Sequence, residues 1–183
     1  MKTRKFLAFL AFAGLLMTAC SNDDDPEPVN EEEVITTMTV TLIPRGGGSN
    51  VVLQSQDLDG DGPNAPVVTV SADFAPNTTY DGRIILLNET ETPAEDITLE
   101  VEEEAEEHQF FYTIGGGLDA TTDYSNVDGN GNPLGTEFTL TTGNASAGTI
   151  AFTLRHDLNK PNSGLADAGG ETDISQTFDV TIQ

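Results

Sequence analysis

Residues 36–42 read Thr-Thr-Met-Thr-Val-Thr-Leu, and this stretch decides the fold class. Apolar and hydroxyl-bearing side chains alternate along it, so that Met38, Val40 and Leu42 fall on one side together with Thr36. Successive side chains of a β-strand point to opposite faces, and the stretch therefore predicts a strand with one buried face. The segment 44–50 that follows contains Pro, Asn and three Gly, which is typical of a turn.

The same alternation returns along the rest of the chain, between short segments rich in Gly, Pro, Asn and Asp. We expect further strands within residues 51–54, 68–74, 80–86, 110–114, 118–124, 138–140, 150–154 and 178–182. An α/β fold would need a helix between successive parallel strands, and this spacing leaves no room for one. The sequence thus predicts an all-β fold for residues 34–183, a Greek-key, immunoglobulin-like β-sandwich of about 8–9 strands.

One segment departs from the strand pattern. Residues 92–95, Thr-Pro-Ala-Glu, combine a capping residue, a proline at the first helical position and a Glu three residues after the cap. With apolar residues at positions 94, 97, 101 and 105, this predicts one short acidic crossover helix over residues 93–107. A strand through Ile97, Leu99 and Val101 is the alternative. The six Glu within residues 100–107 are interpreted either as a cation-attracting surface or as a solvated face.

Residues 1–19 have the features of a secretory leader. Three basic residues precede a twelve-residue apolar run from Phe6 to Met17, which is shorter than the roughly 20 residues that span a bilayer. The run ends in Leu-Met-Thr-Ala-Cys at 16–20, which resembles the lipobox of bacterial lipoproteins. The resemblance implies cleavage before Cys20 and acylation of that residue, with the lipid bilayer as its partner. A free or disulfide-bonded Cys20 after ordinary secretion is the alternative.

Residues 20–33 form an acidic, proline-containing tether, in which like charges keep the chain extended. This acidic segment, the Glu-rich stretch before residues 108–112 and the Gly-Gly-Glu-Thr-Asp of residues 169–173 resemble small Bacteroidota-type surface lipoproteins. That family implies an outer-membrane location facing the cell exterior. Some members are labelled type 1 periplasmic binding fold proteins, which implies a larger α/β body than these residues can build. The resemblance therefore implies a location and no reaction, and a generic acidic linker is the alternative.

The net charge excludes one class of partner. The chain has 183 residues, with 31 acidic and 7 basic side chains, and a formal net charge of −24. Removal of residues 1–19 would leave four basic residues against the 31 acidic ones, a net charge of −27. Nucleic acid binding requires clustered Lys and Arg, so we expect no nucleic acid partner.

Two loops have the alternating carboxylates and glycines that calcium sites use, which predicts Ca²⁺ as a cofactor. The candidate ligands are Asp57, Asp59 and Asp61 in the first loop and Asp128, Asn130 and Asn132 in the second. The first loop resembles the opening half of EF-hand and dockerin loops. A complete EF-hand is excluded, because Val68 and Thr139 stand where the closing Glu should be. Hairpin turn chemistry is the alternative for both loops, since Asp, Asn and Gly also tolerate positive φ.

His108 and His156 are the only histidines, and the chain has one Cys. A transition-metal site therefore requires the two histidines to meet across the sandwich and to recruit Asp157 or a Glu. His156 and Asp157 with Ser163 nearby also suggest a hydrolase, but no strand-to-helix nucleophile elbow accompanies this serine. The simpler interpretation is a strand end followed by a turn.

Three functions from different classes follow from these patterns. The first is a non-enzymatic, outer-membrane lipoprotein that acts as a binding or accessory module, with an outer-membrane protein as a possible partner. The second is a glycan-binding module of a nutrient-uptake system, which would expose the rings of Tyr80, Tyr112 and Tyr124 for stacking on sugars. The third is a carboxylate-dependent hydrolase, for which the sequence nominates no catalytic residue.

Overall fold

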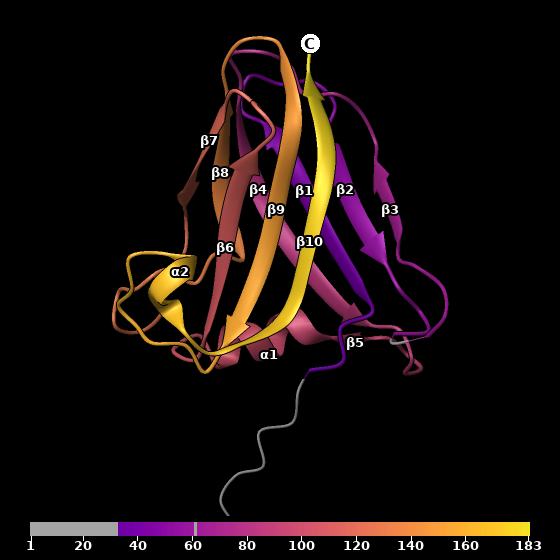
Figure 1. Ribbon diagram of the computed structural model, residues 1–183, viewed down its shortest axis with the longest axis vertical. Coiled ribbons are helices and arrows are strands. Elements are labelled where there is room, and N and C mark those ends of the chain that lie inside the picture. Colours follow the sequence, from indigo (N-terminus) through magenta and orange to yellow (C-terminus); the bar gives the residue numbers. More distant parts are fainter. Residues whose placement is uncertain (1–32, 61) are drawn as a thin grey trace, which may run out of the picture. The chain divides into compact units, whose positions relative to one another are not determined.

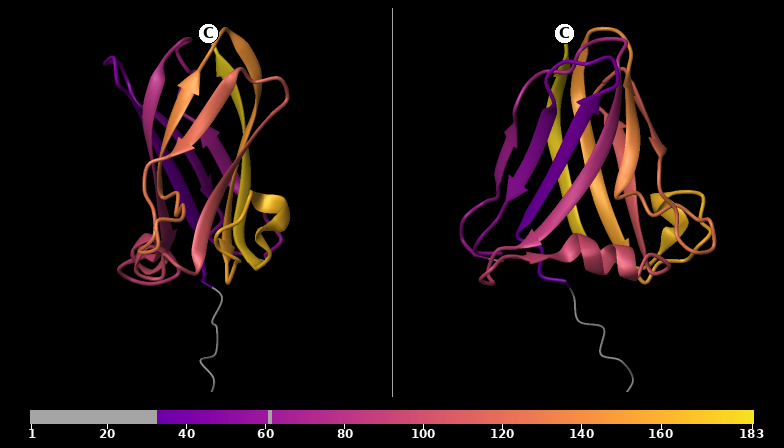
Figure 2. Two further views of the ribbon diagram at one scale, coloured as in Figure 1. Left: turned by 90° about the vertical axis from the view of Figure 1, so that its left-hand side faces the viewer. Right: turned by 180° about the vertical axis from the view of Figure 1, so that it is seen from behind.

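A computed structural model describes residues 33–60 and 62–183, and within them all nine predicted strands are present. They form two antiparallel sheets that pack face to face (Figures 1 and 2). The strands are β1 (Thr37–Pro44), β2 (Val51–Gln56), β3 (Val67–Val70), β4 (Thr79–Asn88), β5 (Glu95–Asp96), β6 (His108–Gly115), β7 (Ala120–Tyr124), β8 (Glu137–Thr142), β9 (Ser146–His156) and β10 (Glu171–Ile182). The helices are α1 (Ile97–Glu103) and α2 (Leu165–Ala168).

The larger sheet has seven strands, and its first four have Greek-key topology. Its order is β3-β2-β1-β4-β8-β7, with β5 paired to β4 off this path. Thus β1, β2 and β3 follow one another, and β4 returns to lie beside β1, which is the order 4-1-2-3 of a Greek key. The prediction of an all-β Greek-key sandwich is confirmed, with the two-residue β5 as an additional strand.

The smaller sheet has the order β10-β9-β6, so the division into seven and three strands differs from the nearly even one of immunoglobulin domains. One side of the sandwich is closed by a bridge between the sheets, where Phe74 pairs in parallel with Ile182. The Phe74 N–H donates to the carbonyl of Thr181, and the Gln183 N–H donates to the carbonyl of Phe74. Ser55 also donates across the sandwich to Gln176 at 2.9 Å.

The core lies between the sheets and follows the predicted alternation. Met38, Val40 and Leu42 are fully buried on β1, and each such side chain contributes about 1.5–3 kcal/mol through burial. Phe138 and Phe152 meet from opposite sheets with ring centroids 5.6 Å apart. Within the described part of the chain, no helix has the length and hydropathy needed to cross a bilayer.

The predicted helix is shorter and begins later than the sequence indicated. Expected over residues 93–107, α1 spans Ile97–Glu103, and its N-cap is Asp96, whose side chain accepts from the Thr98 N–H at 3.1 Å. The start predicted at Pro93, with Thr92 as the cap, is wrong because Glu95 and Asp96 pair with β4 as strand β5 before the helix begins. Ile97 and Val101 are buried as expected, and α1 lies across one end of the sandwich (Figure 1).

Candidate functional site

Two histidines meet at the end of the sandwich that carries α1. His108 is the first residue of β6 and His156 is the last residue of β9, and the register of these antiparallel strands places them directly opposite each other. Their rings stack with centroids 4.2 Å apart and planes 25° apart. The meeting that a metal site requires therefore occurs, but between neighbouring strands of one sheet rather than across the sandwich.

Both histidines continue rows of core-facing side chains. His108 precedes Phe110 on β6, and His156 follows Phe152 and Leu154 on β9, each at a spacing of two residues. His108 is 0% exposed and His156 is 4% exposed. Because buried polar groups are stable only with partners, the surroundings of the two rings must supply hydrogen bonds or charges.

Glu33 supplies the main partner. Its side chain is 3% exposed, and its two carboxylate oxygens face different rings. The Oε1 atom lies 3.0 Å from Nε2 of His108, and Oε2 lies 3.5 Å from Nδ1 of His156. The sequence predicts that Glu33 belongs to the acidic tether, whereas the structure buries its side chain against the sandwich.

A β-bulge brings a second carboxylate to the same place. The register between β9 and β10 shifts between Thr172 and Ile174, so Asp173 is the extra residue. Bulges redirect side chains, and that of Asp173 is 3% exposed and lies 3.9 Å from Nε2 of His108 and 4.0 Å from Nδ1 of His156. Sequence reasoning missed Glu33 and Asp173, and no local pattern marks either, because a bulge and a long-range contact leave no periodicity.

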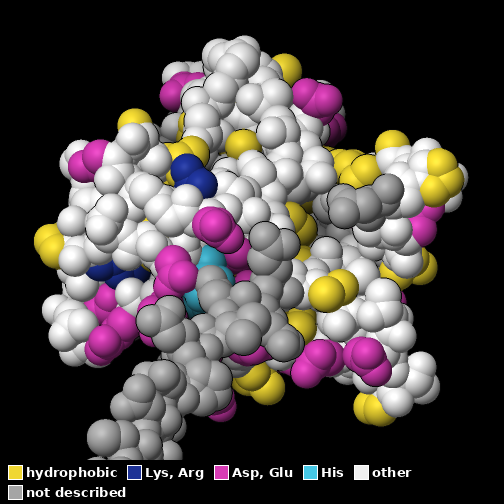
Figure 3. Space-filling model, turned by 60° about the horizontal axis from the view of Figure 1, so that its bottom comes forward, with side chains coloured by type: hydrophobic (Ala, Val, Ile, Leu, Met, Phe, Trp, Pro, Cys, Tyr) yellow, Lys and Arg dark blue, Asp and Glu magenta, His cyan; other side chains and the backbone are white. Residues whose placement is uncertain are grey.

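Two glutamates at the end of α1 complete the group. The carboxylate of Glu107 lies 3.8 Å from Nε2 of His156 and is mostly exposed, and the backbone carbonyl of Glu104 lies 3.2 Å from Nδ1 of His108. We call His108, His156, Glu33 and Asp173, with Glu104 and Glu107 at their edge, the histidine–carboxylate cluster. Figure 3 shows this end of the molecule, where acidic side chains lie next to the histidines.

Charge in the cluster is unbalanced toward the negative. Burial lowers the pKa of His108, but the hydrogen bond and the charge of Glu33 outweigh it, and the pKa is raised overall. Burial raises the pKa of Glu33, but the hydrogen bond and charge of His108 outweigh it, and that pKa is lowered. Burial and the charges of Glu33 and Glu104 raise the pKa of Glu100 nearby. This end of the sandwich therefore favours a cation.

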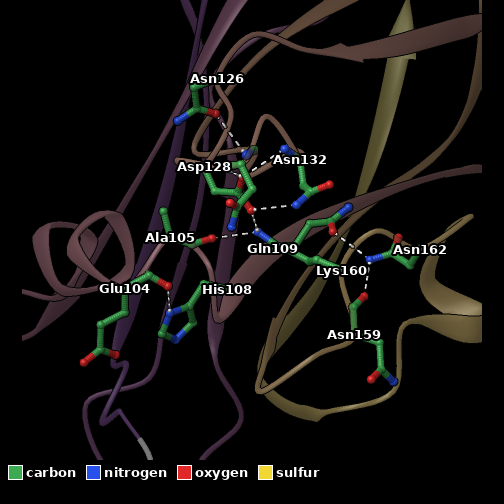
Figure 4. Close-up of polar contacts among 12 residues, drawn as sticks. Glu104, Ala105, His108, Gln109, Asn126, Asp128, Asn132, Asn159, Lys160 and Asn162 are labelled. Atoms are coloured by element: carbon green, nitrogen blue, oxygen red, sulfur yellow. Dashed lines mark hydrogen bonds and ion pairs between the residues drawn. The ribbon is translucent and has the colours of Figure 1, made fainter.

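In the second predicted calcium loop, both carboxylate oxygens of Asp128 already accept hydrogen bonds from other residues of the protein. The Oδ1 atom of Asp128 accepts from the backbone N–H groups of Asn130 and Asn132, both at 2.9 Å. Its Oδ2 atom accepts from the Asn132 side chain at 3.3 Å and from Nζ of Lys160, also at 3.3 Å, and Lys160 donates as well to the carbonyl of Ala105 at 2.7 Å (Figure 4). These contacts match the turn interpretation, and a Ca²⁺ ion would have to displace Lys160.

The first predicted calcium loop borders an open cavity of about 290 Å³. Asp57 and Asp59 both line it, and Asn64 donates to Asp59 at 2.6 Å. One oxygen of Asp57 is buried and makes no hydrogen bond. Asp61 lies outside the described residues, so the three predicted ligands cannot be compared as a set.

The tyrosines of the glycan-binding hypothesis and the serine of the hydrolase hypothesis make hydrogen bonds within the fold. Tyr80 is 2% exposed, and its hydroxyl accepts from the Ala75 N–H. Tyr112 donates to the carbonyl of Gly135, and Tyr124 donates to the carbonyl of Phe110. All three hydroxyls are therefore hydrogen-bonded to the backbone. Ser163 donates to Asp167 at 2.7 Å, which joins the loop before α2 to the helix itself.

Comparisons with family models, curated proteins and solved structures give no significant match to this chain. Cys20 and residues 21–32 of the acidic segment after it lie outside the described residues.

Proposed function

We propose that this chain is a non-enzymatic lipoprotein of the outer membrane, anchored through acylated Cys20 and displayed toward the cell exterior as a binding or accessory module. The leader and lipobox of residues 1–20 support the anchor, and the acidic residues that follow support outward display. The strongly negative charge supports a protein or membrane-associated partner over nucleic acid.

One geometric observation carries the proposal: the two ends of the sandwich differ. Glu33 and the start of β1 lie at the end covered by α1, while the β1–β2 loop and the C-terminus lie at the opposite end (Figure 1). The predicted tether joins the folded domain at Glu33, so its point of attachment lies at the α1 end. The opposite end would then be free for a partner, and it holds a cavity of about 420 Å³ lined in part by Pro44, Asp73 and Tyr80.

The contacts of the cluster support a non-enzymatic role. Catalysis by paired carboxylates needs access for substrate and water, and His108, Glu33 and Asp173 are almost fully buried. Glycan binding would need exposed aromatic rings, and Tyr124 is the only Tyr or Phe among the large exposed apolar side chains of the described residues, at 37%. No contact among the described residues specifically supports catalysis or glycan binding.

The anchor is tested by changing Cys20 to Ser in the full chain, produced in a bacterium that processes lipoproteins. The native chain should sediment with the outer membrane and carry acyl groups by mass spectrometry, whereas Cys20→Ser should be soluble after cell lysis. A native chain with an unmodified cysteine, or with residues 1–19 still attached, would contradict the proposal.

Outward display is tested separately by protease treatment of intact cells. The native chain should be cleaved, and a variant with Asp23, Asp24 and Asp25 changed to Asn should stay membrane-bound but protected. Equal protection of both proteins would leave the anchor in place and reject surface display.

A further inference from the structure

We propose that the histidine–carboxylate cluster binds one divalent transition-metal ion, with Zn²⁺ as the best fit, through Nε2 of His108, Nδ1 of His156 and the carboxylate of Glu33. The inference does not depend on the lipid anchor.

His108 needs a positive charge on the side facing Glu33. A backbone carbonyl can only accept, so the 3.2 Å contact with Glu104 assigns the proton of the ring to Nδ1. In the neutral ring, Nε2 then presents a lone pair to a carboxylate oxygen of Glu33 only 3.0 Å away. Two acceptors at this distance repel unless a proton or a metal ion lies between them.

A proton on His108 would satisfy only half of the Glu33 carboxylate. It serves Oε1, whereas Oε2 is buried and makes no hydrogen bond, and the nearest ring atom, Nδ1 of His156, is 3.5 Å away. A second proton on His156 would place two like charges on rings stacked at 4.2 Å, which is unfavourable. One divalent cation contacts both rings and the carboxylate at once.

The spacing of the ligand atoms fits a tetrahedral metal. Zn²⁺ binds nitrogen and oxygen at about 2.0–2.1 Å, so neighbouring ligands of a tetrahedral site lie about 3.3 Å apart. The Oε1 atom of Glu33 lies 3.0 Å from Nε2 of His108, and its Oε2 atom lies 3.5 Å from Nδ1 of His156, so each ring nitrogen has a carboxylate oxygen close to this distance. Ligand atoms of Glu33, Glu104, His108 and His156 all lie within 4.8 Å of one another, so Glu104 can supply a fourth ligand.

The chemistry of the donors selects the class of metal. Imidazole nitrogen suits Zn²⁺ and its neighbours, whereas Ca²⁺ requires six to eight oxygen ligands. The Nδ1 contact of His108 with the Glu104 carbonyl is the outer hydrogen bond that metal-bound histidines use to fix their orientation. The two histidines are buried, and the exposed Glu104 would close the site on its outer side. A site with four protein ligands is typical of a structural metal, which here would fasten the residue next to the tether onto β6 and β9.

The test uses the full chain with Cys20 changed to Ser in every sample, because a free thiol also binds Zn²⁺. The protein is treated with chelator, checked for folding by circular dichroism and titrated with Zn²⁺ against a chromophoric chelator. We expect one tight Zn²⁺ per chain, a Tm that rises with Zn²⁺ concentration, and the absorption bands of tetrahedral Co²⁺ when cobalt replaces zinc.

The variants Glu33→Gln and His156→Gln locate the ion. Loss of a direct ligand should weaken Zn²⁺ binding by more than about 100-fold, beyond the usual effect of an outer-shell residue. Glu103→Gln is the matched control, because Glu103 lies on α1 beside Glu104 but outside the cluster, and it should bind Zn²⁺ like the parent. Glu33 precedes β1, so Glu33→Gln keeps the test valid even if His156→Gln fails to fold.

Three results would overturn the proposal. The folded parent could bind no Zn²⁺, Glu33→Gln could bind Zn²⁺ as tightly as the parent, or millimolar Ca²⁺ could displace the ion. The second result would assign the zinc to the acidic loops, and the third would indicate an oxygen site without the histidines.

Discussion

Gly82 in β4 shows how closely the core is packed at a single position. It pairs with Leu42 on one side and Phe138 on the other, and a Cβ atom there would lie 2.4 Å from the Phe138 ring. Because Phe138 is 1% exposed, the ring has little room to move. We expect Gly82→Ala to lower the free energy of unfolding by about 1–3 kcal/mol, measured by denaturant titration. Gly46→Ala is the control, since nothing lies within 4 Å of its Cβ position, and equal effects of the two would contradict the packing argument.

Asp128 carries a pH-dependent contribution to stability. Burial raises its pKa, but the N–H groups of Asn132 and Asn130 and the charge of Lys160 outweigh it, so the pKa is lowered. A lowered pKa means that the ionised form stabilises the fold above the ordinary Asp pKa, and that this contribution disappears as pH falls through the lowered value. Besides Asp128, the negative charge of Glu106 also acts on Lys160 and raises the pKa of this lysine, which burial lowers.

We therefore expect Asp128→Asn to cost about 2 kcal/mol at pH 7, because Lys160 keeps only the carbonyl of Ala105 as a partner. The difference from the native chain should shrink as the pH is lowered toward 2, in urea titrations at several pH values. Asp123→Asn, at an exposed position of β7, is the control. A difference that stays constant over this range would show that the charge of Asp128 has no part in it.

The positions of the strands could be predicted from the sequence, but which strands pair with each other could not. Alternation is a local property, so residues 36–42 mark β1 without knowledge of its neighbours. The histidine–carboxylate cluster depends on the register that places His108 opposite His156 and on the bulge at Asp173. Both are set by pairing between strands distant in sequence. The sequence therefore shows that a metal site would need His108 and His156 to meet, but it indicates neither where they meet nor that Glu33 and Asp173 lie beside them.

The start of α1 shows the same limit for helices. Thr92 and Asp96 both have side chains that cap helices, and Thr92 with Pro93 has the stronger local pattern, but pairing of Glu95 and Asp96 with β4 delays the start. We expect Asp96→Ala to lower the free energy of unfolding by about 1 kcal/mol, because the Thr98 N–H loses its acceptor. Thr92→Ala should change it by less than about 0.5 kcal/mol. Thermal unfolding of both variants tests this, and a larger effect at Thr92 would favour the earlier start.

At the scale of the whole molecule, repulsion among the negative charges lowers the free energy of unfolding, and salt should weaken this repulsion. The chain carries 31 acidic side chains against 7 basic ones, and bringing them together in a compact domain adds repulsion that the extended chain lacks. Ion pairs such as Arg45 with Asp81, 2.8 Å apart, offset only a few of these charges. Screening over about 10 Å at 0.1 M salt, against about 30 Å at 0.01 M, should weaken this repulsion.

We expect the chelator-treated chain to gain about 1 kcal/mol of stability between 0.01 and 0.15 M NaCl, a rise of roughly 2–4 °C in Tm. Chelator keeps this effect apart from that of any bound metal, which acts at one site and saturates. A variant with Glu91→Gln and Glu103→Gln, both exposed, removes two of the charges and should respond less to salt than the native chain. If Tm instead fell with salt, attraction between paired charges would outweigh the repulsion between like charges, which would contradict this expectation.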